Sequence, residues 1–373
     1  MLFLKFEMDD GHLVKIDPSD GPYRVVPLGL AVLQDYLGAG GRMAKRSIPI
    51  GIESSFLNST GPTHNHRGPG SVGFEFHPNP KIEVFALVEG GWLPVVFAQA
   101  ELLLPDANVA KKFRLFRAEL SRKPHVPPEL AHLDIPVARI HPILTALEGN
   151  KMQFPTLEEL SQEMHQTADR LANNLASSEV VHPDEQMMLA AYRLSEERKM
   201  TYEKEAELLK YALPRLANRI PTTDLERVHD ELHQKASALQ VSTSSILYYL
   251  LLDSLYDNHP VSKVRQSPGR GVLKPKPDVT DEGIYNALFD VFQLELLVHM
   301  HKVPGAGRGA ICTMDHSLAK AWAMLGLSNF AACQEGGQVS CNMARGFAVR
   351  MPNARRAALS QGPANDMVFE QSK

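Results

Sequence analysis

The sequence predicts an α/β fold in which helices flank a mostly parallel sheet, and two observations predict it. Short apolar runs typical of buried strands occur at Leu102–Leu104 and Gly309–Thr313, and a helical segment follows each of them. Between the two runs, apolar residues recur at a spacing of three to four over most of the chain up to about residue 256, which is typical of amphipathic helices. Strands that alternate with helices along a chain form parallel sheets covered by those helices.

Residues 1–96 are predicted to form a separate strand-rich domain, to which we assign no role. Turn residues separate the short apolar or β-branched runs, and one helix over about Leu28–Leu37 lies among them. The predicted strands are Leu2–Phe6, Arg24–Val26, Ser47–Ile52, Val72–Phe76 and Ile82–Val88.

Residues 97–335 are predicted to form the main α/β domain, interrupted by a helical insertion over about 151–277. The insertion ends in a loop, Asp257–Pro277, that is rich in Pro, Gly and cations. A strong helix follows at about Asp281–Met300, where acids in the first turn suit the helix dipole. Residues 336–373 are expected to be loosely structured. The helices predicted inside the insertion are Thr156–Leu175, Glu185–Lys199, Tyr202–Leu213, Asp224–Leu239 and Ser244–Leu252.

The composition argues against several classes of protein. The net charge of −4 excludes a polycation, so contact with a nucleic acid requires locally clustered Lys and Arg. The cysteines, Cys312, Cys333 and Cys341, are odd in number and match no common zinc module, which argues against a disulfide framework and favours the cytoplasm. No apolar run approaches the length that spans a bilayer, so no membrane association is expected. We find no Ser-His-Asp arrangement, nucleophile elbow or Walker-type loop.

Two acidic residues follow the two predicted buried strands. Asp106 follows Leu102–Leu104 across Pro105, and Asp315 follows Gly309–Thr313. In open parallel sheets, ligands bind outside the carboxyl ends of the strands. Each of the two side chains is therefore in a position to face the crevice of the sheet.

Two further acids belong to predicted helices. Asp290 lies in a largely apolar helix and shares a polar stripe with Asn286, which requires polar surroundings on that side. Glu148 ends a short helix, since the Gly and Asn that follow it form a stop signal. A carboxylate in the last turn is disfavoured by the helix dipole, and a nearby cation would remove that penalty.

Four carboxylates gathered in one place suit a hard divalent cation. Mg²⁺ and Mn²⁺ prefer oxygen ligands, and clustered acids raise one another's pKa unless a cation neutralises them. A bound cation lowers the pKa of water and supplies hydroxide for attack on a phosphodiester. Asp106, Glu148, Asp290 and Asp315 are therefore predicted to bind Mg²⁺ or Mn²⁺ and to be catalytic. Taken singly, each acid also has a structural interpretation as a turn, helix-end or ion-pair residue.

Four segments of the chain resemble segments of the PIN-domain family of nucleases. Leu102–Val109 resembles the family's first strand with its Asp-x-Asn motif, and His141–Asn150 resembles the helix that carries an acidic residue. Tyr285–Asp290 is similar to the family's late helix with an inward Asp. Ile311–Ala321 resembles the Thr-x-Asp-x-x-Leu-Ala motif, which is the most specific of the four. The long insertion and the N-terminal domain have no counterpart in a compact member of that family.

The resemblance implies a PIN-like fold over about 97–335 and a Mg²⁺- or Mn²⁺-dependent endonuclease. It further implies that the four carboxylates bind metal or metal-bound water, and that Asn108 and Thr313 orient them. Asn286, on the polar stripe of Asp290, is predicted to join these orienting residues.

The loop before the helix of Asp290 carries cations that are predicted to bring phosphate to the acids, although a solvated linker is the alternative. RNA is the preferred prediction for the substrate. A nuclease that acts on DNA of a particular structure is an alternative. A non-catalytic scaffold also stays open, in which the helical insertion binds a protein partner or a second copy of the chain. The cations are Lys263, Arg265, Arg270, Lys274 and Lys276.

Overall fold

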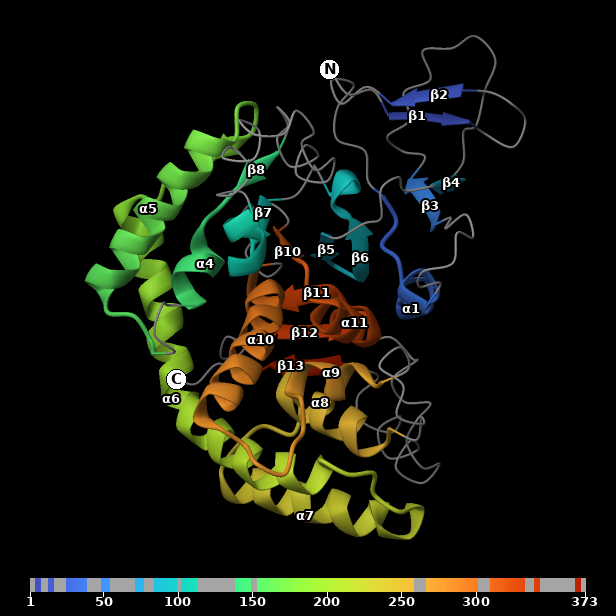
Figure 1. The fold of residues 1–373 in the computed structure, drawn as a ribbon, viewed down its shortest axis with the longest axis vertical. Coiled ribbons are helices and arrows are strands. Elements are labelled where there is room, and N and C mark those ends of the chain that lie inside the picture. The colour runs from blue at the N-terminus through green and yellow to red at the C-terminus, as the bar shows by residue number, and fades with distance from the viewer. Residues whose placement is uncertain are drawn as a thin grey trace.

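A computed structural model gives the fold of the chain (Figure 1), and helices pack around one central sheet. An arc of helices runs along one side of the molecule, formed by α5 (Leu157–Asn174), α6 (Glu185–Leu216) and α7 (Leu225–Ala238). The described residues are 4–7, 13–16, 25–38, 48–53, 71–76, 84–98, 102–112, 138–148, 153–257, 266–300, 309–332, 339–342 and 366–369.

The central sheet contains β5 (Phe85–Val88), β6 (Gly91–Pro94), β7 (Leu102–Pro105), β8 (Arg139–Ile140), β9 (Glu179–Val180) and β10 (Gly309–Thr313). Its strand order is β6-β5-β10-β7-β8-β9. The pairs β10–β7, β7–β8 and β8–β9 are parallel, whereas β5 pairs antiparallel with both β10 and β6. The predicted α/β fold is therefore confirmed, and the sheet is mixed because a hairpin extends it beyond β10.

The hairpin of β5 and β6 precedes the domain boundary predicted at residue 96 and still belongs to the central sheet. Gly90 in its turn has a φ of 85°, a conformation that glycine adopts without steric penalty. The segment before the hairpin is attached as well, because Leu28 and Trp92 exchange backbone hydrogen bonds of 2.9 and 3.1 Å. The sheet thus includes residues that sequence patterns assign to a separate N-terminal domain, since hairpin periodicity does not reveal the strand with which a hairpin pairs.

The rest of the described N-terminal segment follows the predicted pattern of short strands around one helix. β1 (Leu4–Glu7) pairs with β2 (Leu13–Ile16), and β3 (Ile48–Glu53) pairs with β4 (Ser71–Phe76), both antiparallel. The helix α1 (Leu30–Gly38) buries Leu33 and Tyr36 and contacts α11 (His316–Leu325). Of the predicted strand Arg24–Val26, Val25 forms an isolated bridge and Val26 belongs to no strand, while Arg24 lies outside the described residues.

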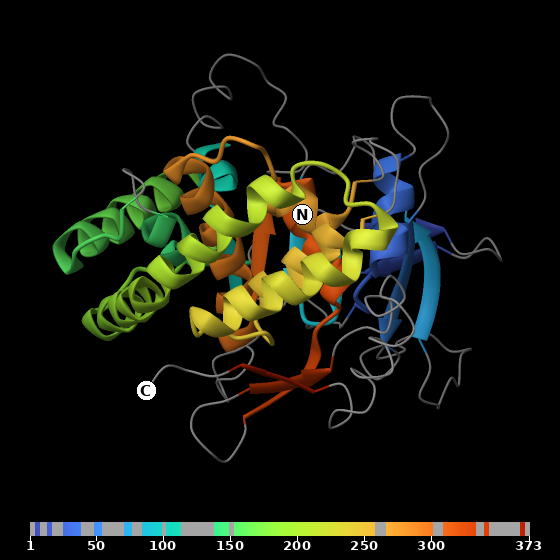
Figure 2. The same ribbon diagram turned by 90° about the horizontal axis from the view of Figure 1, so that it is seen from below.

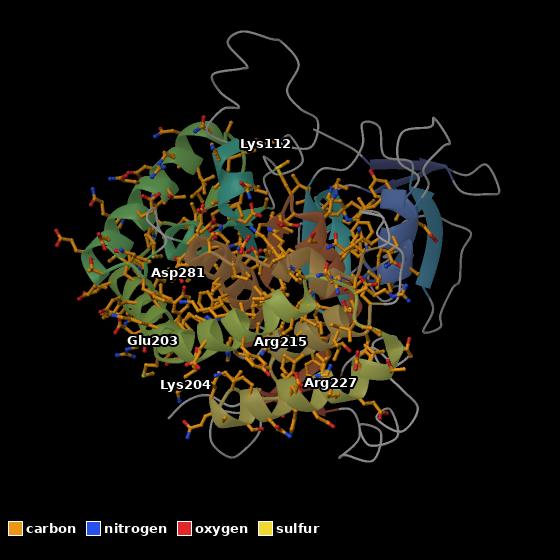
Figure 3. The ribbon with its side chains drawn as sticks, turned by 60° about the horizontal axis from the view of Figure 1, so that its bottom comes forward. Lys112, Glu203, Lys204, Arg215, Arg227 and Asp281 are labelled. Atoms are coloured by element: carbon orange, nitrogen blue, oxygen red, sulfur yellow. The ribbon has the colours of Figure 1, made fainter. Side chains whose placement is uncertain are left out.

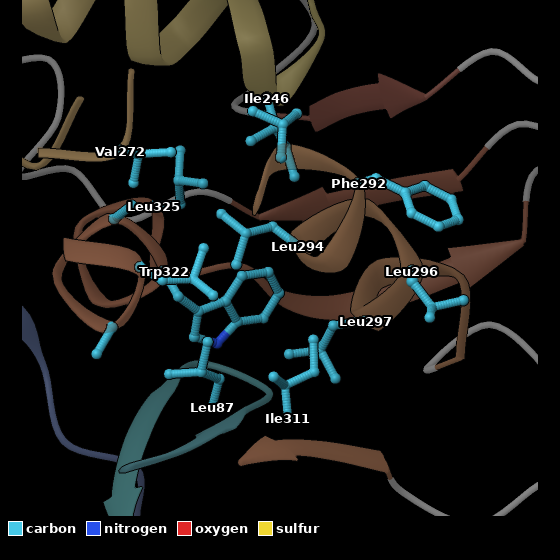
Figure 4. Packing of buried hydrophobic residues seen from close by; sticks show 14 of the residues in the cluster. Leu87, Ile246, Val272, Phe292, Leu294, Leu296, Leu297, Ile311, Trp322 and Leu325 are labelled. Atoms are coloured by element: carbon cyan, nitrogen blue, oxygen red, sulfur yellow. The ribbon is translucent and has the colours of Figure 1, made fainter. Parts of the chain in front are cut away.

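The main core surrounds β10, all of whose residues are buried. The helices α10 (Asp281–Met300) and α11 pack against this strand. Trp322 of α11 is fully buried, and its indole N–H donates to the carbonyl oxygen of Val88 at 2.6 Å. Figure 4 shows the indole ring between Leu87 of β5 and Leu294 of α10. This packing fixes the two helices that follow and precede β10, and with them the acids that they carry.

The predicted helical insertion packs directly on α10. Sequence patterns predict two helices, Glu185–Lys199 and Tyr202–Leu213, where the structure has the single helix α6. No residue between the two predicted helices breaks a helix, so the backbone continues through them. Arg198 of α6 is buried, and its guanidinium lies 2.6 Å from Glu205 and 3.5 Å from Glu295 of α10.

The segment predicted as the loop Asp257–Pro277 contains a short helix, α9 (Pro268–Leu273), so this part of the prediction is wrong. It packs against α8 (Ile246–Leu255), a helix whose residues are all buried. The backbone N–H of Gly269 donates to the carboxylate of Asp253 at 2.7 Å, and a Cβ on this glycine would lie 2.2 Å from the carbonyl oxygen of Leu250. The Pro and Gly that suggested a loop instead start a helix and permit its close approach.

The C-terminal residues predicted to be loosely structured include two strands. β12 (Val339–Asn342) pairs antiparallel with β11 (Ser328–Ala332) and with β13 (Asp366–Phe369). This small sheet lies along the lower edge of the view in Figure 2. The prediction is therefore wrong for these strands. They form through backbone hydrogen bonds to strands distant in the sequence, which a local sequence pattern does not reveal.

The close approach of α9 to α8 leads to a prediction about stability. Gly269→Ala should lower the free energy of unfolding by about 2 kcal/mol, since backbone must move to accommodate the new methyl group. The matched control is Gly29→Ala, because a Cβ at Gly29 meets no atom within 4 Å. Urea unfolding followed by circular dichroism measures both. Equal midpoints for the two variants would contradict the tight packing of α9.

Candidate functional site

The site lies where the chain reverses its direction of progress across the sheet. From β7 the chain adds β8 and then β9 on one side, and it returns to place β10 on the other side of β7. The carboxyl ends of the parallel strands β7 and β10 flank this reversal point, which is where open α/β sheets bind ligands. Asp106 directly follows β7, and Asp315 lies two residues after β10.

Asp106 is buried, with 5% of its surface exposed, and hydrogen bonds hold its carboxylate. The backbone N–H of Val109 donates to Oδ1 at 2.7 Å, and the hydroxyl of Thr313 donates to Oδ2 at 2.7 Å. Burial raises the pKa of Asp106, and the charge of Asp315 raises it further, while the two hydrogen bonds lower it. The carboxylate is thus fixed in position while its charge is only partly compensated.

Thr313 connects the two strand ends. Its hydroxyl donates to Asp106 and accepts the backbone N–H of Asp315 at 2.9 Å. Asp315 in turn caps α11, because its Oδ1 accepts the N–H groups of Ser317 at 2.6 Å and Leu318 at 3.3 Å. Both capping bonds are accepted by the same oxygen atom, Oδ1, and they fix the carboxylate of Asp315 at the start of α11.

Glu148 is the last residue of α4 (Ile143–Glu148). Burial raises the pKa of Glu148 to about 7, and the charge of Asp106 contributes to the increase. The backbone N–H of Ala107 donates to the carboxylate and opposes this increase. The phenol of Tyr285 on α10 donates to the backbone carbonyl of Glu148 at 2.9 Å. The end of α4 is thereby attached both to α10 and to the helical turn after β7.

Asp290, on α10, also has a raised pKa. Burial raises the pKa of Asp290 to about 8, and the charges of Asp315, Glu148 and Asp106 add to the increase. Lys274, at the end of α9, favours the charged form and opposes the increase. Each of the other three acids thus acts electrostatically on Asp290, so the four predicted carboxylates share one region of the protein.

The four carboxylates lie in a region of negative charge that the described side chains only partly neutralise. Among the described residues, the ion pairs of the protein join other acids, such as Glu205 with Arg198 and Asp257 with Arg270. Buried acids whose pKa is raised by neighbouring acids are a common feature of functional sites, because a ligand cation or a proton then has to supply the missing charge.

The residues present match Mg²⁺ or Mn²⁺ in donor type. Carboxylate oxygens are the ligands that these hard cations prefer. Among the described residues, no three His, Cys, Asp or Glu side chains are arranged to hold one metal ion directly. Mg²⁺ keeps several of its waters and is usually bound through one or two carboxylates, so two direct ligands with water-mediated contacts to the other acids fit the chemistry of this set.

The structure also describes two asparagines and two lysines that were predicted for the site. Asn108 is exposed, and its backbone N–H, not its side chain, stabilises the charged form of Asp106. Asn286 is exposed and lines a hollow of about 300 Å³ together with Lys274 and Lys276. Lys274 has a left-handed φ of 49° at the C-cap of α9, which directs the chain from α9 toward α10.

Among the other predicted phosphate-binding cations, the structure describes Arg270, and its contacts do not support that role. The guanidinium of Arg270 donates to the carbonyl oxygens of Ser254 at 3.2 Å and Asn218 at 3.3 Å, and it lies 3.5 Å from Asp257. These contacts hold α9 in place, so Arg270 is a structural residue. Lys263 and Arg265 lie outside the described residues.

Sequence patterns did not identify every residue around the acids. Tyr285 was interpreted only as part of a motif, although its phenol contacts the backbone of Glu148 and burial raises the pKa of Tyr285 to about 12. Lys111 and Lys112, which line a second hollow beside Asp315, were also missed. Their position in the sequence could have identified them, because they lie one to two turns after Asp106 on a helix that begins at residue 107.

Comparisons of the chain with family models, with curated proteins and with solved structures found no match. Among the described helices, none combines the length and the apolar character needed to cross a bilayer.

The raised pKa of Asp290 leads to a prediction about pH and metal ions. For an acid whose pKa is higher in the folded than in the unfolded state, the stabilisation is complete below the ordinary pKa of 3.8 and is lost as the pH rises to about 8. In EDTA, the melting temperature should therefore fall by about 5 °C or more between pH 5 and pH 9. Addition of Mn²⁺ should reverse most of this fall at pH 9, because the cation compensates the ionised cluster.

Asp290→Asn is the matched variant for this measurement, since it removes the charge and keeps the shape of the side chain. It should flatten the pH dependence in EDTA and weaken the response to Mn²⁺, as measured by differential scanning fluorimetry. A variant whose pH profile and Mn²⁺ response equal those of the wild type would show that Asp290 does not belong to the cluster.

Proposed function

We propose that the protein is a nuclease that uses Mg²⁺ or Mn²⁺ to hydrolyse phosphodiester bonds, with RNA as its substrate. The observation that carries the proposal is that Asp106, Glu148 and Asp315 each raise the pKa of Asp290, near the reversal point of the sheet. Acids so placed repel one another in the free protein, and a divalent cation would remove that repulsion.

A PIN-like fold is part of the same proposal. The parallel strands β7, β8 and β10, with acids after β7 and β10 and on α4 and α10, agree with the order of elements in that family. The hydrogen bond between Thr313 and Asp106 agrees with the orienting role that the resemblance implies for this threonine. The insertion from α5 to α9 is additional to the compact family domain.

The roles of the four acids follow from their environments. Asp106 and Asp315 are held by hydrogen bonds at the two strand ends and would bind the metal ion. A bound ion would supply Lewis acidity and charge neutralisation at the phosphate. Glu148, whose pKa burial raises to about 7, is suited to accept a proton from the attacking water near neutral pH. As the bond to the leaving oxygen breaks, that oxygen takes up a proton, which Asp290 is suited to provide in its protonated form.

The proposal predicts that loss of either strand-end acid removes catalysis without unfolding the protein. Asp106→Asn keeps an oxygen that accepts the N–H of Val109, and Asp315→Asn keeps a good helix cap. Each variant should lower the rate of Mn²⁺-dependent oligonucleotide cleavage by about 100-fold or more, with a circular dichroism spectrum like that of the wild type. Asp169→Asn, at an exposed acid on α5, is the control and should retain full activity. Full activity in both strand-end variants would refute the proposal.

The choice of RNA over DNA is tested separately. Single-stranded RNA and DNA of one base sequence, with equal labels, should be cleaved at different rates, with RNA faster, because the 2′-hydroxyl is the group by which a protein distinguishes the two. Faster cleavage of DNA would show that DNA is the substrate, and the proposed metal-dependent hydrolysis would stand unchanged. Absence of cleavage for both, together with no Mn²⁺-dependent change in melting temperature, would favour the scaffold alternative.

A further inference from the structure

A hollow of about 560 Å³ lies directly beside Asp315. The residues that line it come from two places, the helix over residues 107–112 and the segment between β10 and α11. They are Asn108, Lys111, Lys112, Met314, Asp315 and His316. Because both segments directly follow the strands that carry Asp106 and Asp315, the hollow is continuous with the candidate site.

The charge on this hollow is suited to a polyanion. Lys111 is exposed and Lys112 is half-buried, and both belong to the helix whose first residue, Ala107, donates its backbone N–H to Glu148. The start of the helix that carries the two lysines is thus attached to the acid cluster. Asp315 is the single acid among the lining residues, and it also belongs to the cluster of acids.

The uncharged lining residues are suited to a nucleotide base. Asn108 is exposed and presents an amide, while Met314 offers a flexible apolar surface. The ring of His316 is in edge-to-face contact with Phe85 of β5, at a centroid distance of 5.4 Å and an interplanar angle of 86°. Since Phe85 is fully buried, this contact fixes the orientation of the His316 ring at the hollow.

We propose that this hollow binds the strand next to the cleaved bond, with Lys111 and Lys112 on backbone phosphates and one unpaired base against Met314 and His316. The ligand class is single-stranded nucleic acid, because a base within a duplex cannot present its face to these side chains. This inference rests on the proposed function and adds to it the path by which the strand enters.

The test uses the full chain and a fluorescent single-stranded oligonucleotide, with fluorescence anisotropy as the readout. Binding is measured in EDTA, so that divalent-ion-dependent cleavage does not occur. The variant is Lys111→Gln with Lys112→Gln. The control is Lys199→Gln with Lys204→Gln, two exposed lysines on α6, and Figure 3 shows Lys204 at the opposite end of the molecule from Lys112.

The Lys111/Lys112 double variant should weaken binding by about tenfold at low salt, with the control unchanged. Its plot of log affinity against log salt should be less steep by about 0.7 for each phosphate that the protein no longer neutralises. A blunt duplex of the same sequence should bind the wild type more weakly than the single strand does. In the cleavage assay with Mn²⁺, the variant should raise KM and leave kcat within about twofold, since the lysines bind substrate and do not touch the reacting atoms.

Several outcomes would overturn the inference. Equal affinities of the Lys111/Lys112 variant and the wild type, or equally weakened binding in the variant and the control, would show that the hollow does not bind the strand. Absence of single-strand binding by the wild type would do the same, as would tighter binding of the duplex. Binding that depends on both lysines, in a protein that cleaves nothing with Mn²⁺, would support this inference while refuting the proposed nuclease activity.

Discussion

The parallel pairing of β7 with β10, reinforced by the hydroxyl of Thr313, is the constraint on which the rest of the site depends. Ile311 is in register with Leu104, so the two strands end side by side. Thr313 then donates to Asp106 on the neighbouring strand and accepts the backbone N–H of Asp315 on its own. Two acids that are distant in sequence are thereby placed at fixed positions by one buried side chain. Because α11 starts directly after Asp315 and the helix over 107–112 starts directly after Asp106, both helices take their direction from the same pair of strand ends.

A cluster of this kind opposes folding, and the surrounding core has to offset the effect. Burial and mutual repulsion raise the pKa values of Glu148 and Asp290, so either the acids stay protonated or the folded state becomes less stable when they ionise. Hydrophobic packing around β10, including the buried Trp322, supplies stability that does not change with pH. The same electrostatic imbalance that weakens the free protein favours a bound cation, which links stability to ligand binding at this site.

The sequence predicted those elements whose signals are local. The strands β7 and β10 are short apolar runs, α10 has acids in its first turn, and the acids at the strand ends follow directly from these elements. The sequence did not predict β8 and β9, because two-residue strands have no periodicity, or α9, because its helix depends on contacts with α8. The role of Arg270 was also misjudged, since a cation in a Pro- and Gly-rich segment looks exposed until Asp257 and the carbonyl of Ser254 are found beside it.

The insertion is structurally part of the site and not a separate module attached to it. Arg198 of α6 lies at 3.5 Å from Glu295 and donates to the carbonyl oxygen of Leu288, so α6 contacts α10 on both sides of Asp290 in the sequence. At the other end of the insertion, Lys274 lies at the C-cap of α9, and its charge favours the ionised form of Asp290. A buried arginine left without its acids, or acids left without their arginine, is strongly destabilising. The position of Asp290 therefore depends on the insertion, and a chain shortened to the compact α/β domain would lose both the support of α10 and the one described cation that partly compensates Asp290.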